Sequence, residues 1–96
     1  MTAPTVENTD IFRRAVNVSF TSLGDEVLVL DTRQRRSHRL PDTAAFIWLQ
    51  CNGRTSVADI ITHLTDEYDV TEDTARADVL EILERYLAAG IIEHAG

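Results

Sequence analysis

Residues 27–42 read VLVLDTRQRRSHRLPD and contain signals for two strands, a turn and the start of a helix. Its apolar start, Val27 to Leu30, is typical of a short, well-covered strand. The polar residues Asp31 to Gln34 then predict a turn, and Arg35 to Leu40 predicts an arginine-rich strand. Pro41, with an acid directly after it, is typical of the first turn of a helix. The stretch therefore predicts a β-hairpin that leads into a helix.

A further strand is expected before this hairpin. Val16, Val18 and Phe20 alternate with polar residues, and a period of two with β-branched side chains predicts a half-buried strand. Gly24 and Asp25 supply the residues that turns prefer. Three strands joined by short turns form an antiparallel meander, and its third strand has a free edge.

Three helices are expected after the meander. The first includes Ala44 to Cys51 and ends at Asn52-Gly53, because glycine readily adopts the left-handed conformation that ends helices. Ser56 is expected to cap the second helix, and the third runs from Thr71 to Gly90. Ile91-Ile92 is expected to return to the core, in a short strand at most. The fold class is therefore α+β: a small winged-helix-like domain with a three-stranded antiparallel sheet followed by three helices.

The length of 96 residues suits one domain. Residues 1–10 are polar and lack periodicity, so we expect a flexible N-terminal arm, with the domain spanning residues 11–96. No apolar run is long enough to span a bilayer, and the start does not resemble a signal peptide, so a cytoplasmic location is expected. The single cysteine, Cys51, excludes an internal disulfide.

Charge is distributed unevenly along the chain. The net charge of −7 argues against a general nucleic-acid binder, because phosphate contacts need clustered cations. All the cations are arginines, and four of them lie between Arg33 and Arg39. Many of the acids lie between Asp66 and Glu84, on the last two predicted helices. This separation predicts a cationic surface on the third strand.

No set of residues predicts catalysis. Cys51 lies in an apolar helix and is expected to be a buried, unreactive thiol. His63 and Glu67 are four residues apart on a helix, but two ligands do not form a metal site. The four glycines are dispersed, which excludes a phosphate-binding loop. We therefore expect a non-enzymatic protein without a metal or a cofactor.

Two interpretations of the arginine-rich edge are open from the residues alone. Charge protects exposed strand edges from aggregation. Alternatively, the edge accepts an extended peptide as an added strand, and the arginines attract its acidic side chains. The third helix has two adjacent apolar stripes, one with Leu80, Leu83 and Leu87 and the other with Val79, Ile82 and Tyr86. The second stripe either widens the core or is available for another contact.

Several segments, in this order and spacing, carry a resemblance to a known family: residues 29–40, Thr43-Ala44-Ala45-Phe46-Ile47-Trp48, Asn52-Gly53, Ser56-Val57-Ala58-Asp59-Ile60, Tyr68-Asp69-Val70 and Leu87-Ala88-Ala89-Gly90-Ile91-Ile92. The chain resembles the PqqD family, which includes coenzyme PQQ synthesis protein D and recognition elements for ribosomally made, modified peptides. The resemblance implies a peptide-binding protein that acts as a peptide chaperone in natural-product biosynthesis.

The resemblance also implies a site and partners. A leader peptide would pair antiparallel with the third strand, against the third helix, and be delivered to a modifying enzyme such as a radical SAM protein or a leader peptidase and cyclase. Arg35 stands where relatives often have a turn glycine, and Ser37 where an aromatic residue is frequent. The implied peptide-binding residues are Arg35, Arg36, Ser37, His38, Arg39, Leu40, Arg76, Val79, Ile82, Leu83 and Tyr86.

Alternative functions remain open at this point. One is a winged-helix DNA-binding or regulatory domain, although its third helix would be acidic where a recognition helix is basic. Another is a structural subunit of a biosynthetic enzyme complex. The free edge strand could also pair with its own copy in a homodimer.

Overall fold

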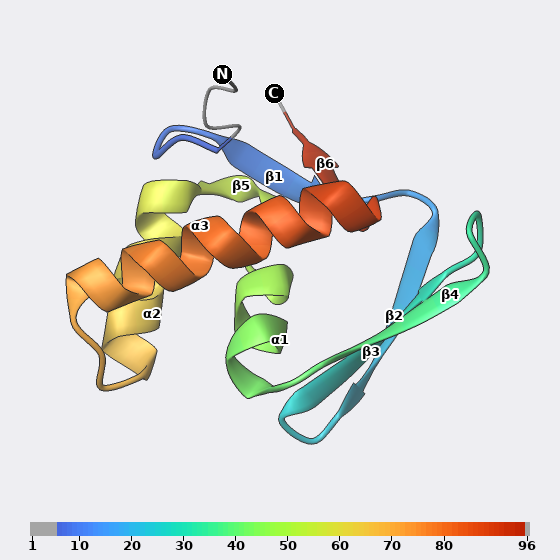
Figure 1. Ribbon diagram of the computed structural model, residues 1–96, viewed down its shortest axis with the longest axis horizontal. Helices are drawn as coiled ribbons and strands as arrows, with labels where there is room; N and C mark the ends of the chain where they lie inside the picture. Colours follow the sequence, from blue (N-terminus) through green and yellow to red (C-terminus); the bar gives the residue numbers. More distant parts are fainter. Residues whose placement is uncertain (1–5, 96) are drawn as a thin grey trace.

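The computed structural model describes residues 6–95, which form three helices and two small antiparallel sheets (Figure 1). One sheet has the strand order β2-β3-β4 and the other has the order β5-β1-β6. In chain order the elements are β1 (Ile11–Arg14), β2 (Val18–Leu23), β3 (Glu26–Asp31), β4 (Arg36–Leu40), α1 (Asp42–Leu49), β5 (Asn52–Ser56), α2 (Val57–Glu67), α3 (Glu72–Ala89) and β6 (Ile92–His94).

The predicted meander is confirmed as the sheet β2-β3-β4. Val29 at its centre pairs with Phe20 on one side and with His38 on the other. Three boundaries differ from the expectation, one of them because Asp31 ends β3 rather than beginning the turn. Val16 lies in the turn before β2 and is 79% exposed, and Arg35 belongs to the β3–β4 turn rather than to the strand. A turn that must reverse the chain within a few residues takes up the first arginine of the predicted strand.

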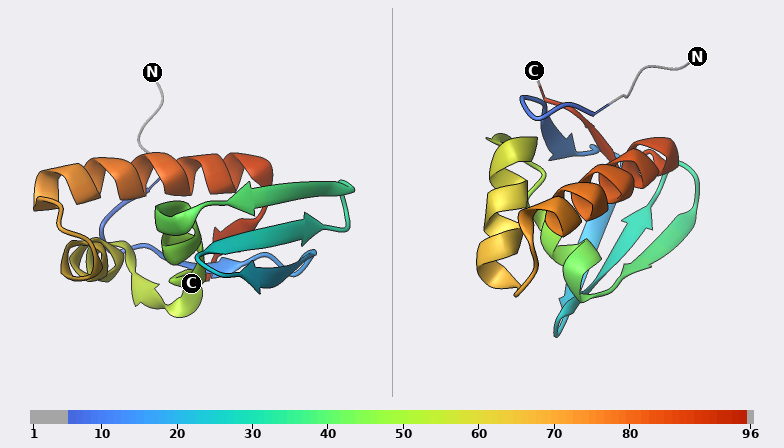
Figure 2. Two further views of the ribbon diagram at one scale, coloured as in Figure 1. Left: turned by 90° about the horizontal axis from the view of Figure 1, so that it is seen from below. Right: turned by 60° about the vertical axis from the view of Figure 1, so that its left-hand side comes forward.

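The inner face of the meander packs on the helices. Val27 and Val29 point to this face and are buried, as expected for a central strand. They join Trp48 of α1 and Leu83 of α3 in a single core. The views in Figure 1 and Figure 2 show α3 passing across the molecule, with α1 and α2 on one side of it and β4 beside its C-terminal half.

The helix ends follow the predicted caps. The side chain of Ser56 accepts a hydrogen bond from the Asp59 amide at 3.2 Å, and Thr71 accepts one from Thr74 at 3.2 Å. Gly90 ends α3 in the left-handed conformation, with φ 75°. The first helix differs slightly from the expectation, because Pro41 is its N-cap rather than its first helical residue.

The second sheet was not predicted. Its central strand β1 pairs antiparallel with both β5 and β6, and Arg13 forms an ion pair with Glu93 at 2.6 Å across the β1–β6 pair. The sequence Asn52-Gly53 indicated the stop of a helix that includes Cys51, but α1 already ends at Leu49 with Gln50 as its C-cap. Asn52 and Gly53 instead begin β5, where Gly53 has a left-handed φ of 81°. The chain then continues as β5 because the backbone of β1 offers partners that the local sequence cannot reveal.

Part of the expected N-terminal arm is packed on the domain. Residues 1–5 lie outside the described residues, but Val6 is buried. The carbonyls of Asn8 and Asp10 accept hydrogen bonds from the amides of Ala58 and Val57, at 3.0 and 2.9 Å. These amides open α2, where helical amides lack partners within the helix, so residues 6–10 satisfy them. Within residues 6–95, no helix is both long and apolar enough to cross a membrane.

Candidate functional site: a groove beside a free strand edge

A groove of about 320 Å³ lies between β4 and the C-terminal half of α3. Residues of β4 form one wall, residues of α3 form the other, and the segments after β4 and α3 close its base. The lining residues are His38, Arg39, Leu40, Pro41, Ala44, Ile82, Arg85, Tyr86, Ala89 and Ile91. A cavity of this size can hold one or two side chains of a bound segment.

The base of the groove is apolar. Leu40, Tyr86 and Ile91 are almost fully buried beneath it. The hydroxyl of Tyr86 donates a hydrogen bond to the Ala44 carbonyl at 2.6 Å, and burial raises the pKa of Tyr86 well above its usual value. The hydroxyl therefore stays neutral and engaged, and the ring offers an apolar surface to a ligand.

The β4 edge on the groove side has no strand partner in the described part of the chain, because β4 pairs with β3 alone. The pairing register assigns its side chains to two faces. His38 and Leu40 are opposite Val29 and Val27 on the inner face, while Ser37 and Arg39 lie on the outer face. The arginines of the expected edge are thus divided between the faces, because side chains alternate along a strand.

The β3–β4 turn is held rigidly beside the groove. The Oδ1 atom of the buried Asp31 accepts hydrogen bonds from the Asn17 side chain at 2.9 Å and from the amides of Arg33 and Gln34 at 3.0 and 3.1 Å. These hydrogen bonds, led by that of Asn17, lower the pKa of Asp31. Gln34 in turn donates to the Ala89 carbonyl of α3 at 3.2 Å. The turn is therefore fixed to the end of the helix that forms the opposite wall.

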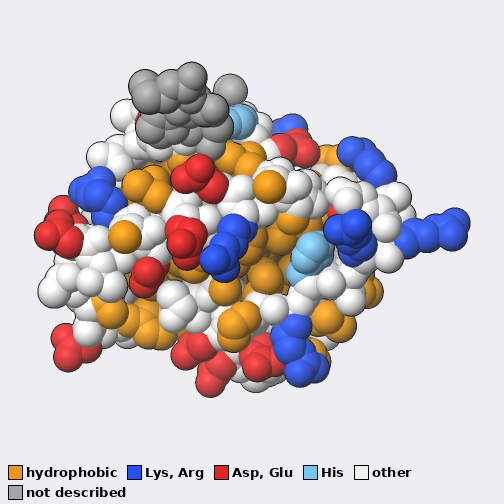
Figure 3. Space-filling model, in the orientation of Figure 1, with side chains coloured by type: hydrophobic (Ala, Val, Ile, Leu, Met, Phe, Trp, Pro, Cys, Tyr) orange, Lys and Arg blue, Asp and Glu red, His pale blue; other side chains and the backbone are white. Residues whose placement is uncertain are grey.

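The arginines at this end of the molecule have few acidic partners. Arg33, Arg35 and Arg36 are exposed and form no ion pair with any residue in 6–95. Arg39 and Arg85 have exposed acidic neighbours, Glu26 and Glu81, each at 3.5 Å, and such pairs contribute little. Figure 3 shows basic side chains gathered on the side where β4 and its turn lie, with most acids elsewhere on this face.

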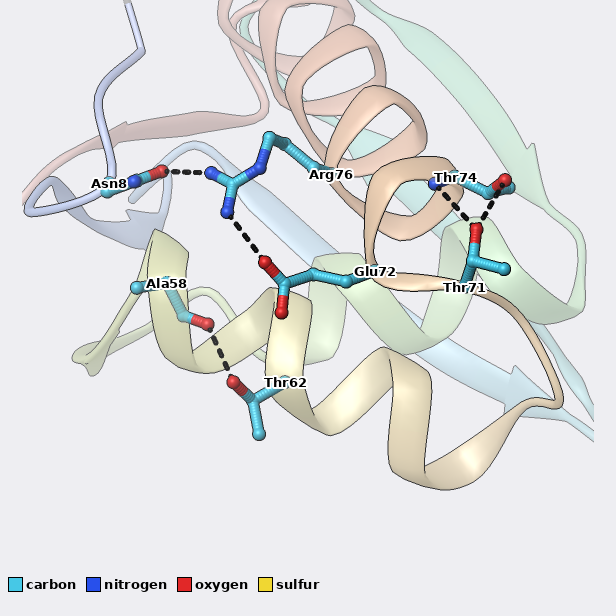
Figure 4. A network of polar contacts seen from close by, with 7 residues as sticks. All are labelled: Asn8, Ala58, Thr62, Thr71, Glu72, Thr74 and Arg76. Carbon is cyan, nitrogen blue, oxygen red and sulfur yellow. Dashed lines mark hydrogen bonds and ion pairs between the residues drawn. The ribbon is translucent and has the colours of Figure 1, made fainter.

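Three of the residues that the sequence analysis assigned to the facing wall lie elsewhere. Val79 and Leu83 are fully buried in the core and do not line the groove. Arg76 lies on the N-terminal half of α3, where it donates to the Asn8 side chain at 2.9 Å and to Glu72 at 3.2 Å (Figure 4). The sequence pattern left the rotation of the helix open, and packing turns Val79 and Leu83 into the hydrophobic core.

Ile82 and Tyr86 do line the groove. The helical spacing from Ile82 predicts two further lining residues that are absent from the expected set. Positions three and seven residues after Ile82 share its helix face, and these are Arg85 and Ala89. Helical spacing does not predict the remaining lining residues Pro41, Ala44 and Ile91, because they enter the groove from neighbouring segments. The groove therefore combines residues from four parts of the chain.

The described residues offer little for catalysis. Cys51 is buried, and burial raises its pKa to about 12, so its thiol is protonated at neutral pH. Among residues 6–95 there is no group of three or more histidine, cysteine or acidic side chains placed to hold a metal ion.

Two solved structures share the fold. One, described as TbiB1 in complex with the TbiA(beta) leader peptide, has a TM-score of 0.79 and 20% identity and covers 84% of this chain and 94% of its own. The other, described as lasso peptide synthetase B1 complexed with the leader peptide, has a TM-score of 0.77 and 28% identity and covers 85% and 96%. Among curated proteins the comparison finds no match.

A family model gives the assignment. The model of coenzyme PQQ synthesis protein D (PqqD) matches residues 26–92, which include the β3–β4 hairpin, all three helices and every residue that lines the groove. The match confirms the resemblance carried by the sequence. The chain therefore belongs to the PqqD family.

Proposed function

We propose that this protein binds the leader segment of a ribosomally made precursor peptide in the groove between β4 and α3 and presents it to a modifying enzyme. The observation that carries the proposal is a strand edge, unpaired within residues 6–95, directly beside an apolar groove. A strand edge supplies backbone hydrogen bonds for any extended peptide, and a flanking pocket selects side chains. Both similar structures hold a leader peptide, according to their descriptions, which supports this class of ligand.

The leader would run antiparallel to β4 as a fourth strand of the sheet. Every second side chain would then point towards the groove, where Leu40, Ile82 and Tyr86 offer apolar contacts. The others would lie on the outer face, next to Ser37 and Arg39. We expect apolar residues at alternate positions of the leader and acidic residues between them or flanking them, because guanidinium groups pair strongly with carboxylates.

The protein would act without catalysis of its own. Its contribution is to raise the local concentration of the precursor at the enzyme, as any linked binding module does. The enzyme would be a radical SAM protein or a leader peptidase with its cyclase. We infer no metal, cofactor or nucleic acid in this function.

Backbone N-methylation of the leader tests strand addition directly. The leader encoded next to this protein is synthesised with one N-methyl group at each position in turn, and binding is measured by calorimetry. The unmodified peptide should bind at micromolar affinity or tighter. A strand directs its amides towards a given neighbour only at alternate positions. N-methylation should therefore lower affinity about tenfold or more at every second position of the paired segment, and it should have little effect at the positions between them. Equal effects at all positions would contradict strand addition.

A matched pair of helix variants tests the groove. Ile82 and Leu80 are both partly buried on α3, but only Ile82 lines the groove, whereas Leu80 lies on a different face of the helix. Ile82→Ala should weaken leader binding about tenfold, the equivalent of a lost buried contact, while Leu80→Ala should leave it unchanged. If the two variants had equal affinity, the peptide would bind elsewhere.

A further inference from the structure

The sheet β2-β3-β4 has a second free edge, on β2. Within residues 6–95, β2 pairs with β3 alone, and five of its six residues are exposed. Its sequence, VSFTSL, contains no charged residue. Proteins commonly protect an exposed edge with charge, proline or a bulge, and β2 has none of these. The edge is therefore open to another strand.

Apolar side chains gather along this edge. On β2 itself, Phe20 is 42% exposed and Leu23 is 45% exposed. Val16, which precedes the strand, is also exposed. Leu30 is opposite Ser19 on the neighbouring strand, and Leu49 lines the same shallow pocket as Ser22. These five residues account for all the large hydrophobic side chains that are exposed in the described chain. Phe20 lies on the inner face of the sheet, whereas Leu23 and Leu30 lie on the outer face, so apolar side chains flank this edge on both sides.

We propose that a second copy of this chain docks on the β2 edge, with the two β2 strands antiparallel across a twofold axis. The strand contains no charged residue, so pairing two copies places no like charges opposite one another. Arg14 lies over the Phe20 ring, but its guanidinium donates to the carbonyls of Leu49 and Cys51 of its own chain. Self-pairing through β4 would instead bring the guanidinium groups of Arg36 and Arg39 near those of the other copy, and like charges across strands are destabilising. The choice between the two edges therefore follows from the arginines.

The alternation of side chains restricts the register. Facing residues of two paired strands must lie on the same side of the sheet, so a residue can be opposite only residues of its own face. A twofold axis at Phe20 satisfies this condition. It places the two Phe20 rings opposite one another and Ser19 opposite Thr21, and aromatic pairs are among the most favourable cross-strand pairs. Each ring already packs edge-on against Trp48, with centroids 5.0 Å apart, which fixes it at the edge.

The dimer would contain a continuous six-stranded sheet. The two β4 strands would form its outer edges, so both grooves would stay open. This inference is independent of the proposed function, since it concerns the opposite edge of the sheet.

Two serines provide a matched test. Ser19 on β2 and Ser37 on β4 are both opposite Leu30, both exposed and both on the outer face. Sedimentation equilibrium of the full chain should show a monomer–dimer equilibrium over about a hundredfold range of concentration. Ser19→Lys should remain monomeric at concentrations at which the parent protein is dimeric, because lysine blocks an edge. Ser37→Lys adds the same charge and should dimerise like the parent.

Circular dichroism would first establish that both variants fold. A parent protein that stays monomeric at every concentration would overturn the proposal. So would equal effects of the two lysines, or assemblies larger than dimers, because a twofold contact closes upon itself. Leader affinity, measured separately, should be unchanged in Ser19→Lys, so a failure of dimerisation and a failure of leader binding are distinguishable.

Discussion

Two groups of arginines occupy different regions of this protein and have different surroundings. In the first group each guanidinium is bound by the protein. Arg13 pairs with Glu93, Arg76 binds Asn8 and Glu72, and Arg14 donates to the carbonyls of Leu49 and Cys51 at 3.0 and 3.2 Å. These contacts join β1 to β6, α1 to the second sheet, and α3 to residues 6–10.

The second group surrounds the β3–β4 turn and has no such contacts. Arg33, Arg35 and Arg36 are exposed without an ion pair in the described chain, although the protein carries an excess of acids. Asp31 is opposite Arg36 in the strand register, but its carboxylate accepts hydrogen bonds from Asn17 and from the turn amides instead. The first group therefore contributes to folding, while the second is exposed and available to a ligand.

The largest expected effect concerns Arg36 of the second group together with Arg39 on the same strand, which has only an exposed ion pair with Glu26. Arg36→Glu combined with Arg39→Glu should weaken binding of an acidic leader by about tenfold to a hundredfold, because two attractive charges become repulsive. The free energy of unfolding should change by less than about 1 kcal/mol, since both side chains are exposed. Titration calorimetry and chemical denaturation give the two values.

A single-charge control sharpens this test. Arg54 is exposed on β5, in the other sheet, so Arg54→Glu changes the net charge as much as Arg36→Glu does. Affinity should fall with Arg36→Glu and be nearly unchanged with Arg54→Glu. Equal losses would mean that the leader senses only the total charge of the protein.

The first group should show the reverse behaviour. Arg14 also lies over the rings of Phe20 and Trp48, 5.5 Å from each centroid, and it supplies the positive charge that the last turn of α1 lacks. Arg14→Leu should lower the free energy of unfolding by about 1–3 kcal/mol in urea denaturation, because two carbonyls lose a charged donor. Leader affinity of the folded variant should be unchanged, and a parallel loss of affinity would contradict the division into two groups.

The smallest effect is expected at Arg35, where a substitution affects both the free energy of unfolding and leader affinity. It is the only non-glycine residue with a positive φ, 56°, among those described. Because glycine adopts this conformation without steric cost, Arg35→Gly should raise the free energy of unfolding by up to about 1 kcal/mol in thermal or urea unfolding. Arg33→Gly, in the same turn without a positive φ, should not stabilise the protein, and leader affinity should fall slightly in both. A destabilised Arg35→Gly would show that the turn is not strained.

Local signals explain how much of the fold could be predicted. The meander and the helix caps at Ser56 and Thr71 depend on residues within a few positions of one another, so the sequence shows them directly. The second sheet joins β1, β5 and β6 from distant parts of the chain, and each is short. The residues of β5, NGRTS, are typical of a loop, and only pairing with β1 makes them a strand.

The same distinction applies to the site. The β4 edge was predictable because the order of a meander determines which strands lie outside. The helix wall was only partly predictable, since two apolar stripes lie side by side on α3 and packing decides which one is buried. Leu83 enters the core, and Ile82 faces the groove. The positions of Ile91 and Pro41 depend on how separate segments meet.

The second sheet has a consequence for how such a domain can be attached to other proteins. It places β1 and β6 side by side, and the Ala95 amide donates to the Ile11 carbonyl at 2.9 Å. Both ends of the described chain leave the molecule together, at the top of Figure 1, while β4 lies on a different side. A covalent fusion to a larger enzyme at either end, or insertion into one of its loops, would therefore leave the peptide groove accessible.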